Sequence, residues 1–477
     1  MSGLCLAIQL QRAGIHSYTI LEKSQDLGGT WLENSYPGAG CDIPAHVYSF
    51  SFAPKWDWRR KYAEQRDILD YFRECADRFE VRGNIEFGTS VMDAHFDEEQ
   101  GVWQIRTDGG EVRTADILVS AVGQLNRPHV PEFDGLATFR GVTFHSARWN
   151  HDFQLDGRDV AVIGNAASAI QFLPHVARAA RKVCIFQRSP NYIYPRRNYA
   201  YPAWLRHLFR WIPGLARLHR GFMFLVHESQ IFLFENSGRL NRMMTSWIKL
   251  RMRVRVAKKL RSAVTPDYPA GCKRILLSSE YLSTLQRDNV ELVTRPIQHV
   301  QPDGIATEKG LHKVAAIIFA TGFETSRFLV PMKIQGRNGV DLHETWQPRP
   351  KTYLGLMSPG FPNFFTLYGP NTNLGHNSII FMVECQVHYV VRCLRAMIAQ
   401  SSQTIEVRQQ ATEQYDRMLQ KRLSKSVWNA SCNSWYKTAD GAIINNWCGS
   451  ALEYWYRTRR PNLRHYHFKQ RLNRNPE

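Results

Sequence analysis

The sequence lacks a long hydrophobic run, a paired-cysteine motif and a surplus of acidic residues. Its most apolar stretch, residues 222–234, is interrupted by His227 and Glu228 and is too short to span a bilayer. The nine cysteines are irregularly spaced and include no Cys-x-x-Cys pair, which favours reduced thiols over a disulfide framework or a zinc site. We expect no signal peptide before the first domain. These absences predict a cytoplasmic protein with no metal site.

Basic residues outnumber acidic ones by 61 to 42, which gives a net charge of +19. The positive charge gathers in residues 196–261 and 457–474, without any nucleic-acid-binding motif, so no nucleic-acid partner is expected. We expect a solvated helical face, and attraction of a phosphorylated cofactor explains part of the charge. Superficial membrane contact through apolar and basic faces is the alternative. The sequence does not indicate how many copies of the chain assemble.

With 477 residues, 44% of them hydrophobic, the chain is long enough for two to four globular domains. Residues 3–14 predict a helix, and residues 16–21 predict a strand that ends at Glu22. A carboxylate at this place suits the ribose hydroxyls of a dinucleotide. Gly3 then stands as the third glycine of Gly-x-Gly-x-x-Gly. We therefore expect the first strand and the first two glycines to lie upstream of Met1.

A second dinucleotide-binding pattern is complete. Residues 160–163 predict a buried strand, residues 164–169 a turn and residues 170–179 a helix, and a further strand over 183–186 leads to Arg188. Ala166 and Ala169 stand where the second and third glycines are usual. A guanidinium suits a 2′-phosphate, so Arg188 favours NADPH over NADH. The alternative is an exposed arginine at a strand end.

Between the two patterns lies Phe139-x-Gly141-x-x-x-His145-x-x-x-Trp149. This spacing resembles the fingerprint of the flavin-dependent Baeyer–Villiger monooxygenases, although Asn150 stands where that family prefers Pro or Asp. The related N- and S-oxygenating enzymes usually have Tyr or Phe in the place of Trp149. The alternative reading is an ordinary interdomain linker with a helix cap and a buried aromatic residue.

The resemblance implies an α/β fold with two Rossmann-like dinucleotide-binding domains, one for FAD and one for NADP. The domains would be residues 1–138 (first part of the FAD domain), 139–150 (fingerprint linker), 151–330 (NADP domain, with a helical insertion at about 192–262) and 331–477 (return of the FAD domain and C-terminal segment).

The resemblance also implies the cofactor contacts, which are Gly3, Glu22, Gly28, Gly29, Thr30, Trp31, Asp42, Tyr48, Val91, Gly123, Gly164, Asn165, Ala166, Ser168, Ala169, Gln187, Arg188, Lys273, Ile380 and Trp435. The segment Gly271-Cys272-Lys273-Arg274 resembles the one that carries the family's catalytic arginine. By the same resemblance, Arg274 is the catalytic cation and Asp42 holds it.

The implied reaction is insertion of one oxygen atom of O2 beside the carbonyl of a small hydrophobic ketone, through a C4a-peroxyflavin, to give an ester or lactone. Every stage after oxygen addition carries negative charge on oxygen, which a permanent cation such as Arg274 would stabilise. Two alternatives stay open: an N- or S-oxygenating flavin monooxygenase, and a truncated scaffold without catalytic activity.

Overall fold

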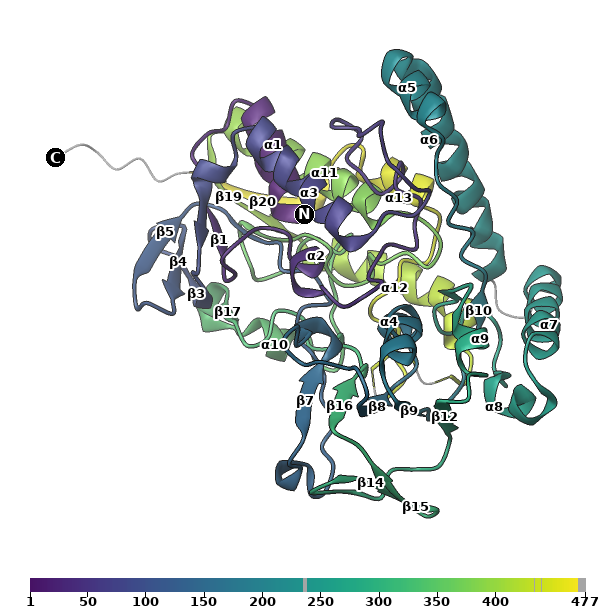
Figure 1. The fold of residues 1–477 in the computed structure, drawn as a ribbon. Coiled ribbons are helices and arrows are strands. Elements are labelled where there is room, and N and C mark those ends of the chain that lie inside the picture. The colour runs from purple at the N-terminus through teal and green to yellow at the C-terminus, as the bar shows by residue number, and fades with distance from the viewer. Residues whose placement is uncertain (235–237, 433, 439, 471–477) are drawn as a thin grey trace.

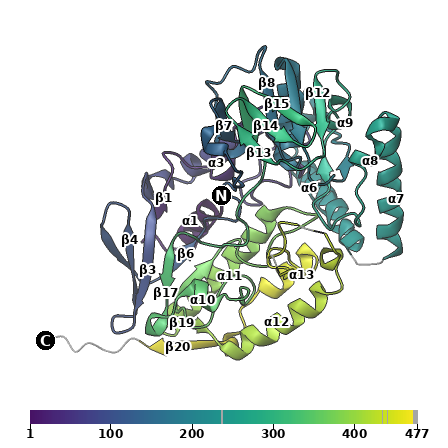
Figure 2. The same ribbon diagram turned by 90° about the horizontal axis from the view of Figure 1, so that it is seen from below.

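The structure is a computed structural model that describes residues 1–234, 238–432, 434–438 and 440–470. Figure 1 shows two α/β bodies, one of which combines the N-terminal and C-terminal parts of the chain and the other its middle part. Helices from the middle of the chain run along one side of the molecule (Figures 1 and 2). The first body is therefore built from segments that are distant in sequence.

The middle body contains a five-stranded, fully parallel sheet. Its order is β12 (Val290–Val293), β9 (Lys182–Phe186), β8 (Asp159–Ile163), β16 (Ala316–Phe319) and β7 (Val142–His145). Successive side chains point to opposite faces, and both faces are buried, as expected of a parallel sheet.

Two different elements cover the faces of this sheet. Val160 and Val162 belong to the same core as helix α4 (Ala167–Ala179). Ala161 and Ile163 belong to a second core beneath the antiparallel strands β13 (His299–Gln301), β14 (Gly304–Thr307) and β15 (Gly310–Lys313). The predicted strands over 160–163 and 183–186, and the helix between them, are present.

In the first body, helix α1 (Ser2–Arg12) packs against two parallel strand pairs. These are β1 (Ile20–Glu22) with β2 (Ile85–Phe87), and β6 (Leu118–Ser120) with β18 (Phe364–Thr366). A Cβ placed on Gly3 would lie 3.7 Å from Ala121 and 3.9 Å from Ile20, so this end of α1 approaches both pairs. Strand β1 is shorter than the strand predicted over residues 16–21.

A second sheet flanks the first body, in the order β17 (Lys333–Gln335), β3 (Val91–Asp97), β4 (Val102–Thr107) and β5 (Val112–Ala115). Its β4–β5 pair is an antiparallel hairpin whose turn contains Asp108-Gly109-Gly110, a sequence typical of hairpin turns. The remaining elements of this body are α2 (Thr30–Glu33), α3 (Gln65–Arg78), α10 (Leu342–Thr345), α11 (Ile379–Ala399), α12 (Gln409–Leu423), α13 (Ala451–Thr458), β19 (Ser402–Val407) and β20 (Tyr466–Gln470). The buried helix α11 contacts both α1 and α13.

The predicted helical insertion consists of α5 (Ala203–Trp211), α6 (Pro213–Glu228), α7 (Arg239–Val254) and α8 (Arg261–Val264). Short strands β10 (Ile193–Tyr194) and β11 (Leu276–Leu277) pair in parallel on either side of it, and α9 (Tyr281–Thr284) follows. Among the described residues, no helix is both long and apolar enough to cross a membrane.

The expectation that all nine cysteines are reduced is wrong. Cys272 and Cys432 form a disulfide across 160 residues of sequence, with their Cα atoms 6.3 Å apart. The other seven cysteines are free and, except for Cys448, buried. Irregular spacing could not reveal this pair, because the fold rather than the local sequence brings the two residues together.

Trp103 anchors the flanking sheet and yields a prediction about stability. The fully buried indole packs against Phe96 and Phe364, and its Nε1 donates a hydrogen bond of 2.9 Å to the carbonyl oxygen of Pro362. We expect Trp103→Ala to lower the free energy of unfolding by about 3–5 kcal/mol, measured by urea denaturation. The half-exposed Trp455 is the control: Trp455→Ala should cost no more than about 0.5 kcal/mol. Equal effects of the two substitutions would contradict this packing.

Candidate functional site

The fingerprint segment provides the edge strand β7 and a contact between the two bodies. A Cβ on Gly141 would lie 2.4 Å from the carbonyl oxygen of Ala315, so β7 approaches its neighbour more closely than a larger residue permits. Trp149 follows the strand, and its ring packs 6.5 Å from Tyr36 of the first body and 5.2 Å from Phe172 on α4. The tryptophan that distinguishes the fingerprint therefore contacts both bodies.

His145 ends β7, and its ring packs 5.8 Å from that of Phe323 in the segment that follows β16. Its Nδ1 accepts a hydrogen bond from the backbone N–H of Ala147, which requires this nitrogen to be unprotonated. Burial lowers the pKa of His145 to about 4. This histidine is therefore neutral near pH 7 and serves as a fixed acceptor in the segment.

A second contact between the bodies involves Gln171 on α4. Its amide group accepts a hydrogen bond of 2.9 Å from the hydroxyl of Tyr36 and donates one of 2.9 Å to the carbonyl oxygen of Gly40. Gly38 lies so close to α4 that an added Cβ would lie 2.8 Å from the backbone oxygen of Gln171. These contacts fix the loop that carries Asp42 against the middle body.

Asp42 and Arg274 form a two-pronged ion pair across this contact. The Arg274 Nε donates to Asp42 Oδ2 at 2.8 Å and its Nη2 donates to Oδ1 at 2.8 Å, while about a quarter of each side chain stays exposed. Burial alone would raise the pKa of Asp42, but the Arg274 guanidinium outweighs it and holds that pKa below its usual value. The carboxylate in turn raises the pKa of Arg274 against the effect of burial. Both groups are charged at neutral pH.

Two groups beside this pair escaped the sequence reasoning. Arg196 donates a hydrogen bond of 2.9 Å to the carbonyl oxygen of Cys41, and its charge also lowers the pKa of Asp42. The phenol of Tyr436 is buried beside Arg274, which opposes the rise that burial causes in the pKa of Tyr436. Arg196 lies in a basic stretch typical of a solvated surface, so its sequence context gave no signal.

The turn after β8 forms a cradle that suits a pyrophosphate. Gly164 has a φ of +104°, and an added Cβ would lie 2.4 Å from the carbonyl oxygen of Ala320, so no larger residue fits. The Asn165 amide holds the turn through hydrogen bonds to Gln187 Oε1 at 2.7 Å and to the carbonyl oxygen of Ser189 at 3.0 Å. Ala166 caps α4, and none of the described side chains bonds its first amides. Those amides, next to Ser168 and the buried Ala169, are left available to an anion.

Two cations adjoin this cradle. Arg188 is exposed just beyond the end of β9, and Lys273 donates a hydrogen bond of 2.8 Å from its Nζ to Ser189 Oγ. Burial lowers the pKa of Lys273, and the charge of Arg188 lowers it further. A bound anion would relieve this repulsion, which fits the 2′-phosphate that distinguishes NADPH.

The first body offers a comparable cradle. Gly28 and Gly29 have φ of +138° and +54°, and none of the described atoms lies within 4 Å of where a Cβ on Gly29 would stand. They lead into α2, whose Thr30 and Trp31 follow directly. The Trp31 indole donates a hydrogen bond of 3.1 Å to the hydroxyl of Tyr48, and burial raises the pKa of that tyrosine. Open space bounded by glycine and a fixed indole suits a flavin nucleotide.

The other predicted cofactor contacts lie at several places. Glu22 ends β1 and its carboxylate accepts a hydrogen bond of 2.9 Å from the N–H of Ser24, while Gly123 follows β6 with a φ of +73°. Ile380 is fully buried at the start of α11. Trp435 packs its ring 4.5 Å from Tyr436, which lies beside the Asp42–Arg274 ion pair. Val91 begins β3 in the flanking sheet. The roles of all these residues as cofactor contacts stay predictions.

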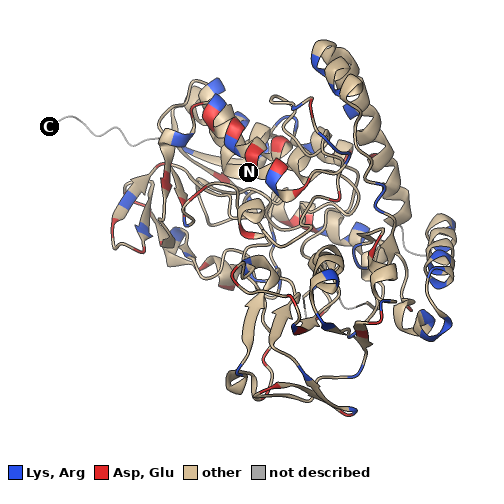
Figure 3. Cartoon of the chain, in the orientation of Figure 1, with Lys and Arg blue, Asp and Glu red and all other residues tan. Residues whose placement is uncertain are grey.

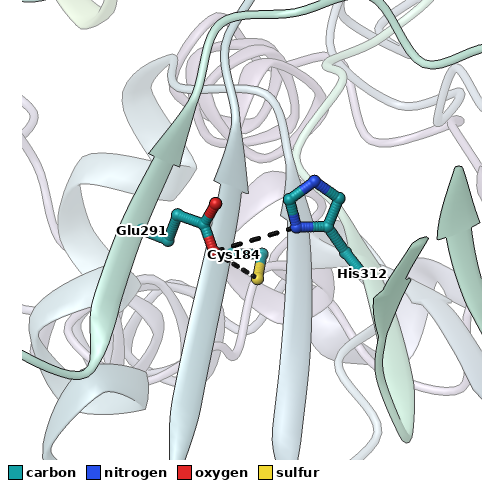
Figure 4. Close-up of side chains that lie close together, drawn as sticks. All are labelled: Cys184, Glu291 and His312. Atoms are coloured by element: carbon teal, nitrogen blue, oxygen red, sulfur yellow. Dashed lines mark hydrogen bonds and ion pairs between the residues drawn. The ribbon is translucent and has the colours of Figure 1, made fainter. Parts of the chain in front are cut away.

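A thiol, a carboxylate and an imidazole also meet on the hairpin-covered face of the middle sheet (Figure 4). The Sγ of Cys184 and the Nδ1 of His312 each lie 3.8 Å from Glu291 Oε2. The same oxygen is paired with Lys182 Nζ at 2.8 Å, and burial raises the pKa of Cys184 to about 12. The carboxylate already has a cationic partner and the thiol is protonated, so these groups are satisfied by one another.

Two nucleotide cradles that meet at a fixed arginine define a flavin- and pyridine-nucleotide-dependent oxidoreductase. Residues 2–209 match the family model of pyridine nucleotide-disulphide oxidoreductases. A Baeyer–Villiger monooxygenase of Streptomyces coelicolor is 38% identical over 468 residues, covering 97% of this chain and 90% of its own length. One of Pseudomonas aeruginosa is 37% identical over 475 residues, covering 98% of this chain and 89% of its own length.

Solved structures agree with this similarity. An oxidised steroid monooxygenase bound to NADP matches with a TM-score of 0.88 and 31% identity over 98% of both chains. The protein named OTEMO, in complex with FAD and NADP, matches with a TM-score of 0.89 and 28% identity over 98% of this chain and 97% of its own. The chain belongs to the Baeyer–Villiger monooxygenase family. The family and the fold class expected from the sequence are thereby confirmed.

The buried imidazole of His145 predicts a dependence of stability on pH. An unfolded histidine has a pKa near 6.5, so acid protonates the unfolded chain before it protonates a native His145 of pKa about 4. As the pH falls from about 6.5 to 4, the free energy of unfolding should therefore drop by up to about 3 kcal/mol from this residue alone. Urea denaturation of the wild type and His145→Gln across this range measures it. Identical pH slopes for the two proteins would contradict the assignment.

The pair of cations beside the second cradle predicts cofactor preference. Arg188→Gln should weaken NADP⁺ binding by about 10–100-fold, because a charge-assisted contact to the 2′-phosphate is lost, and should leave NAD⁺ binding nearly unchanged. Isothermal titration calorimetry measures both. Arg181→Gln alters an exposed arginine just before the other end of the same strand, paired with Asp159, and is the control. Equal weakening of both nucleotides by Arg188→Gln would argue against a phosphate contact.

Proposed function

We propose that this protein uses FAD and NADPH to insert one oxygen atom of O2 beside a ketone carbonyl, giving an ester or lactone. The observation that carries the proposal is the Arg274 guanidinium, which two hydrogen bonds to Asp42 hold between the two nucleotide cradles. Family membership supports the same reaction class. When bound, FAD supplies the activated oxygen and NADPH the hydride that reduces the flavin.

The residues of the two cradles suit these cofactors. Gly3, Gly28 and Gly29 would permit close approach of the FAD diphosphate. The Glu22 carboxylate would accept hydrogen bonds from the ribose hydroxyls of FAD. The uncapped start of α4 would hold the NADPH pyrophosphate, with the Arg188 and Lys273 pair on the 2′-phosphate. The solved relatives named above as complexes with NADP, or with FAD and NADP, support both cofactors.

Arg274 would stabilise the negative charge that develops on oxygen as the ketone carbonyl is attacked. Its guanidinium keeps its proton at every working pH, so it offers a field and hydrogen bonds but no acid catalysis. Asp42 fixes the direction of the guanidinium, and about a quarter of the Arg274 side chain stays exposed. A preorganised donor of this kind commonly contributes about 10²–10³ in rate.

The substrate we propose is a small hydrophobic ketone, used together with O2. Two relatives of known structure are named as a steroid monooxygenase and a cyclohexanone monooxygenase, and both names denote apolar substrates. A cytoplasmic location stays a prediction from the sequence.

Replacing the catalytic cation tests the proposal. In FAD-loaded protein supplied with NADPH, we expect Arg274→Ala to lower kcat for ester formation from a ketone by about 10²–10³, because the oxyanion loses its fixed partner. Gas chromatography of the product measures this rate. Arg274→Lys keeps the positive charge but not the two-pronged ion pair. Its kcat should therefore lie between those of the wild type and Arg274→Ala. Arg287→Ala, an exposed arginine thirteen positions away in sequence, is the control.

The outcomes separate the proposal from its rivals. Undiminished ester formation by Arg274→Ala would overturn the role of the cation. Oxidation of thioethers by the wild type, with no ester from any ketone in a panel, would indicate an N- or S-oxygenating enzyme. A folded protein without flavin absorbance after incubation with FAD would support a scaffold without catalytic activity.

A further inference from the structure

Helix α6 exposes apolar side chains on the face that points away from the molecule. Leu218, Phe222 and Leu225 are 71%, 60% and 57% exposed, and their spacing of four and three residues places them in one row. The opposite row of the same helix, with Ala216 and Met223, is buried. The helix is therefore already packed on its inner side, and its outer row is additional apolar surface.

Helix α7 repeats this arrangement. Met243, Leu250 and Val254 are 69%, 62% and 66% exposed, whereas Ile248 and Met252 on the opposite row are buried. Figures 1 and 2 both show α7 at the outer edge of the molecule. We define the outer face as the exposed apolar side chains of α5, α6 and α7, which are Trp204, Trp211, Leu218, Phe222, Leu225, Val226, Leu240, Met243, Trp247, Leu250 and Val254.

Apolar surface of this extent marks an interaction site, because soluble proteins rarely expose so many large side chains together. Several of them are aromatic, and indole rings are enriched where a bilayer meets water. The basic side chains Arg239, Arg242 and Arg253 are exposed along α7 beside the apolar row. A helix with one apolar row and a basic flank is the pattern that lies flat in a membrane surface.

The positive charge of the helical insertion favours an anionic partner. Residues 203–261 contain thirteen Lys and Arg but only two Asp and Glu. Of the two acids, Glu228 is buried and bonds inward to Asn377. Blue residues without red ones accordingly mark α5 and α7 in Figure 3. Two copies of such a surface would repel each other, whereas anionic phospholipids would attract it.

A cationic cleft adjoins α6. It has a volume of about 580 Å³ and opens between α6, α11 and α13. Five arginines line it, namely Arg217, Arg220, Arg392, Arg459 and Arg460. Burial raises the pKa of Glu384, the acid in its wall. Apolar rings from Phe224, Phe381 and Trp455 line the rest. Guanidinium groups beside apolar rings suit a phosphate headgroup with its attached chain.

We propose that the outer face docks on the surface of a bilayer that contains anionic phospholipids. Helices α6 and α7 lie in the interfacial plane, with their apolar rows among the acyl chains and their arginines at the phosphates. The docking is peripheral and places the mouth of the cleft beside the headgroups. It is independent of the proposed oxygenation chemistry, because none of the residues assigned to the cofactors or the catalytic pair belongs to the outer face.

Co-sedimentation with vesicles tests the proposal on the full chain. The protein should pellet with vesicles of phosphatidylcholine and phosphatidylserine at low salt, bind several-fold less to phosphatidylcholine alone, and be partly released by added salt. Vesicles of both compositions and of equal size are needed, so that curvature does not differ. A protein that stays in the supernatant with the anionic vesicles would overturn the proposal.

Matched variants locate the contact. Met243→Ser/Leu250→Ser should weaken binding to the anionic vesicles about tenfold, because two apolar side chains no longer enter the bilayer. Met92→Ser/Ile398→Ser replaces two exposed apolar residues on β3 and α11 and should bind as the wild type does.

A second pair of variants tests the contribution of the arginines in the same way. Arg242→Gln/Arg253→Gln should weaken binding about tenfold and reduce its salt dependence. Arg66→Gln/Arg78→Gln, on the exposed side of α3, is its control. All four double variants change exposed side chains, and circular dichroism melting checks that each is folded.

Two further results would also overturn the proposal. Equal losses in test and control variants would mean that binding depends on net charge and not on the outer face. Analytical ultracentrifugation of the vesicle-free protein tests whether a second copy of the chain covers the outer face instead. If the wild type is a dimer that Met243→Ser/Leu250→Ser dissociates, and this variant still binds vesicles as the wild type does, the outer face belongs to a dimer interface.

Discussion

The ion pair between Arg274 and Asp42 is the constraint on which the rest of the site depends. The two residues lie 232 positions apart and come from different bodies. Partly desolvated charges are stable together only when their geometry is held, because each would be costly without the other. The contacts around Trp149 and Gln171, and the disulfide next to Lys273, all hold the segments that carry this pair. The arrangement of the two bodies is thus part of the site and not merely its support.

The same contacts couple the two cradles. The loop that carries Asp42 is hydrogen-bonded to α4, whose first turn forms the second cradle. The segment that carries Arg274 includes Cys272, which forms a disulfide with Cys432, three positions before Trp435 in the sequence. A few direct contacts therefore join the segment that carries Arg274 both to α4 and to the loop that contains Cys432.

The helical insertion differs from the other helices in how its apolar side chains are covered. In α4 and α11 the apolar row is buried against a sheet or against other helices. In α6 and α7 one apolar row is buried and another is exposed, which costs solubility unless a partner covers it. The sequence shows apolar periodicity in both cases, and only the packed structure distinguishes the row that belongs to the core from the row that does not.

The sequence by itself determined the features that depend on local patterns. Strands such as residues 160–163, the turn at Gly164 and the Asp-Gly-Gly hairpin follow from hydrophobic alternation and from backbone conformations that glycine permits. The fingerprint around Trp149 and the basic segment at Arg274 indicated the family through short motifs. The tertiary structure alone decided which distant groups meet: Cys272 with Cys432, Arg196 beside Asp42, and Tyr436 beside Arg274. Those pairings depend on how separate elements pack, and residues far apart in sequence carry no local signal of their contact.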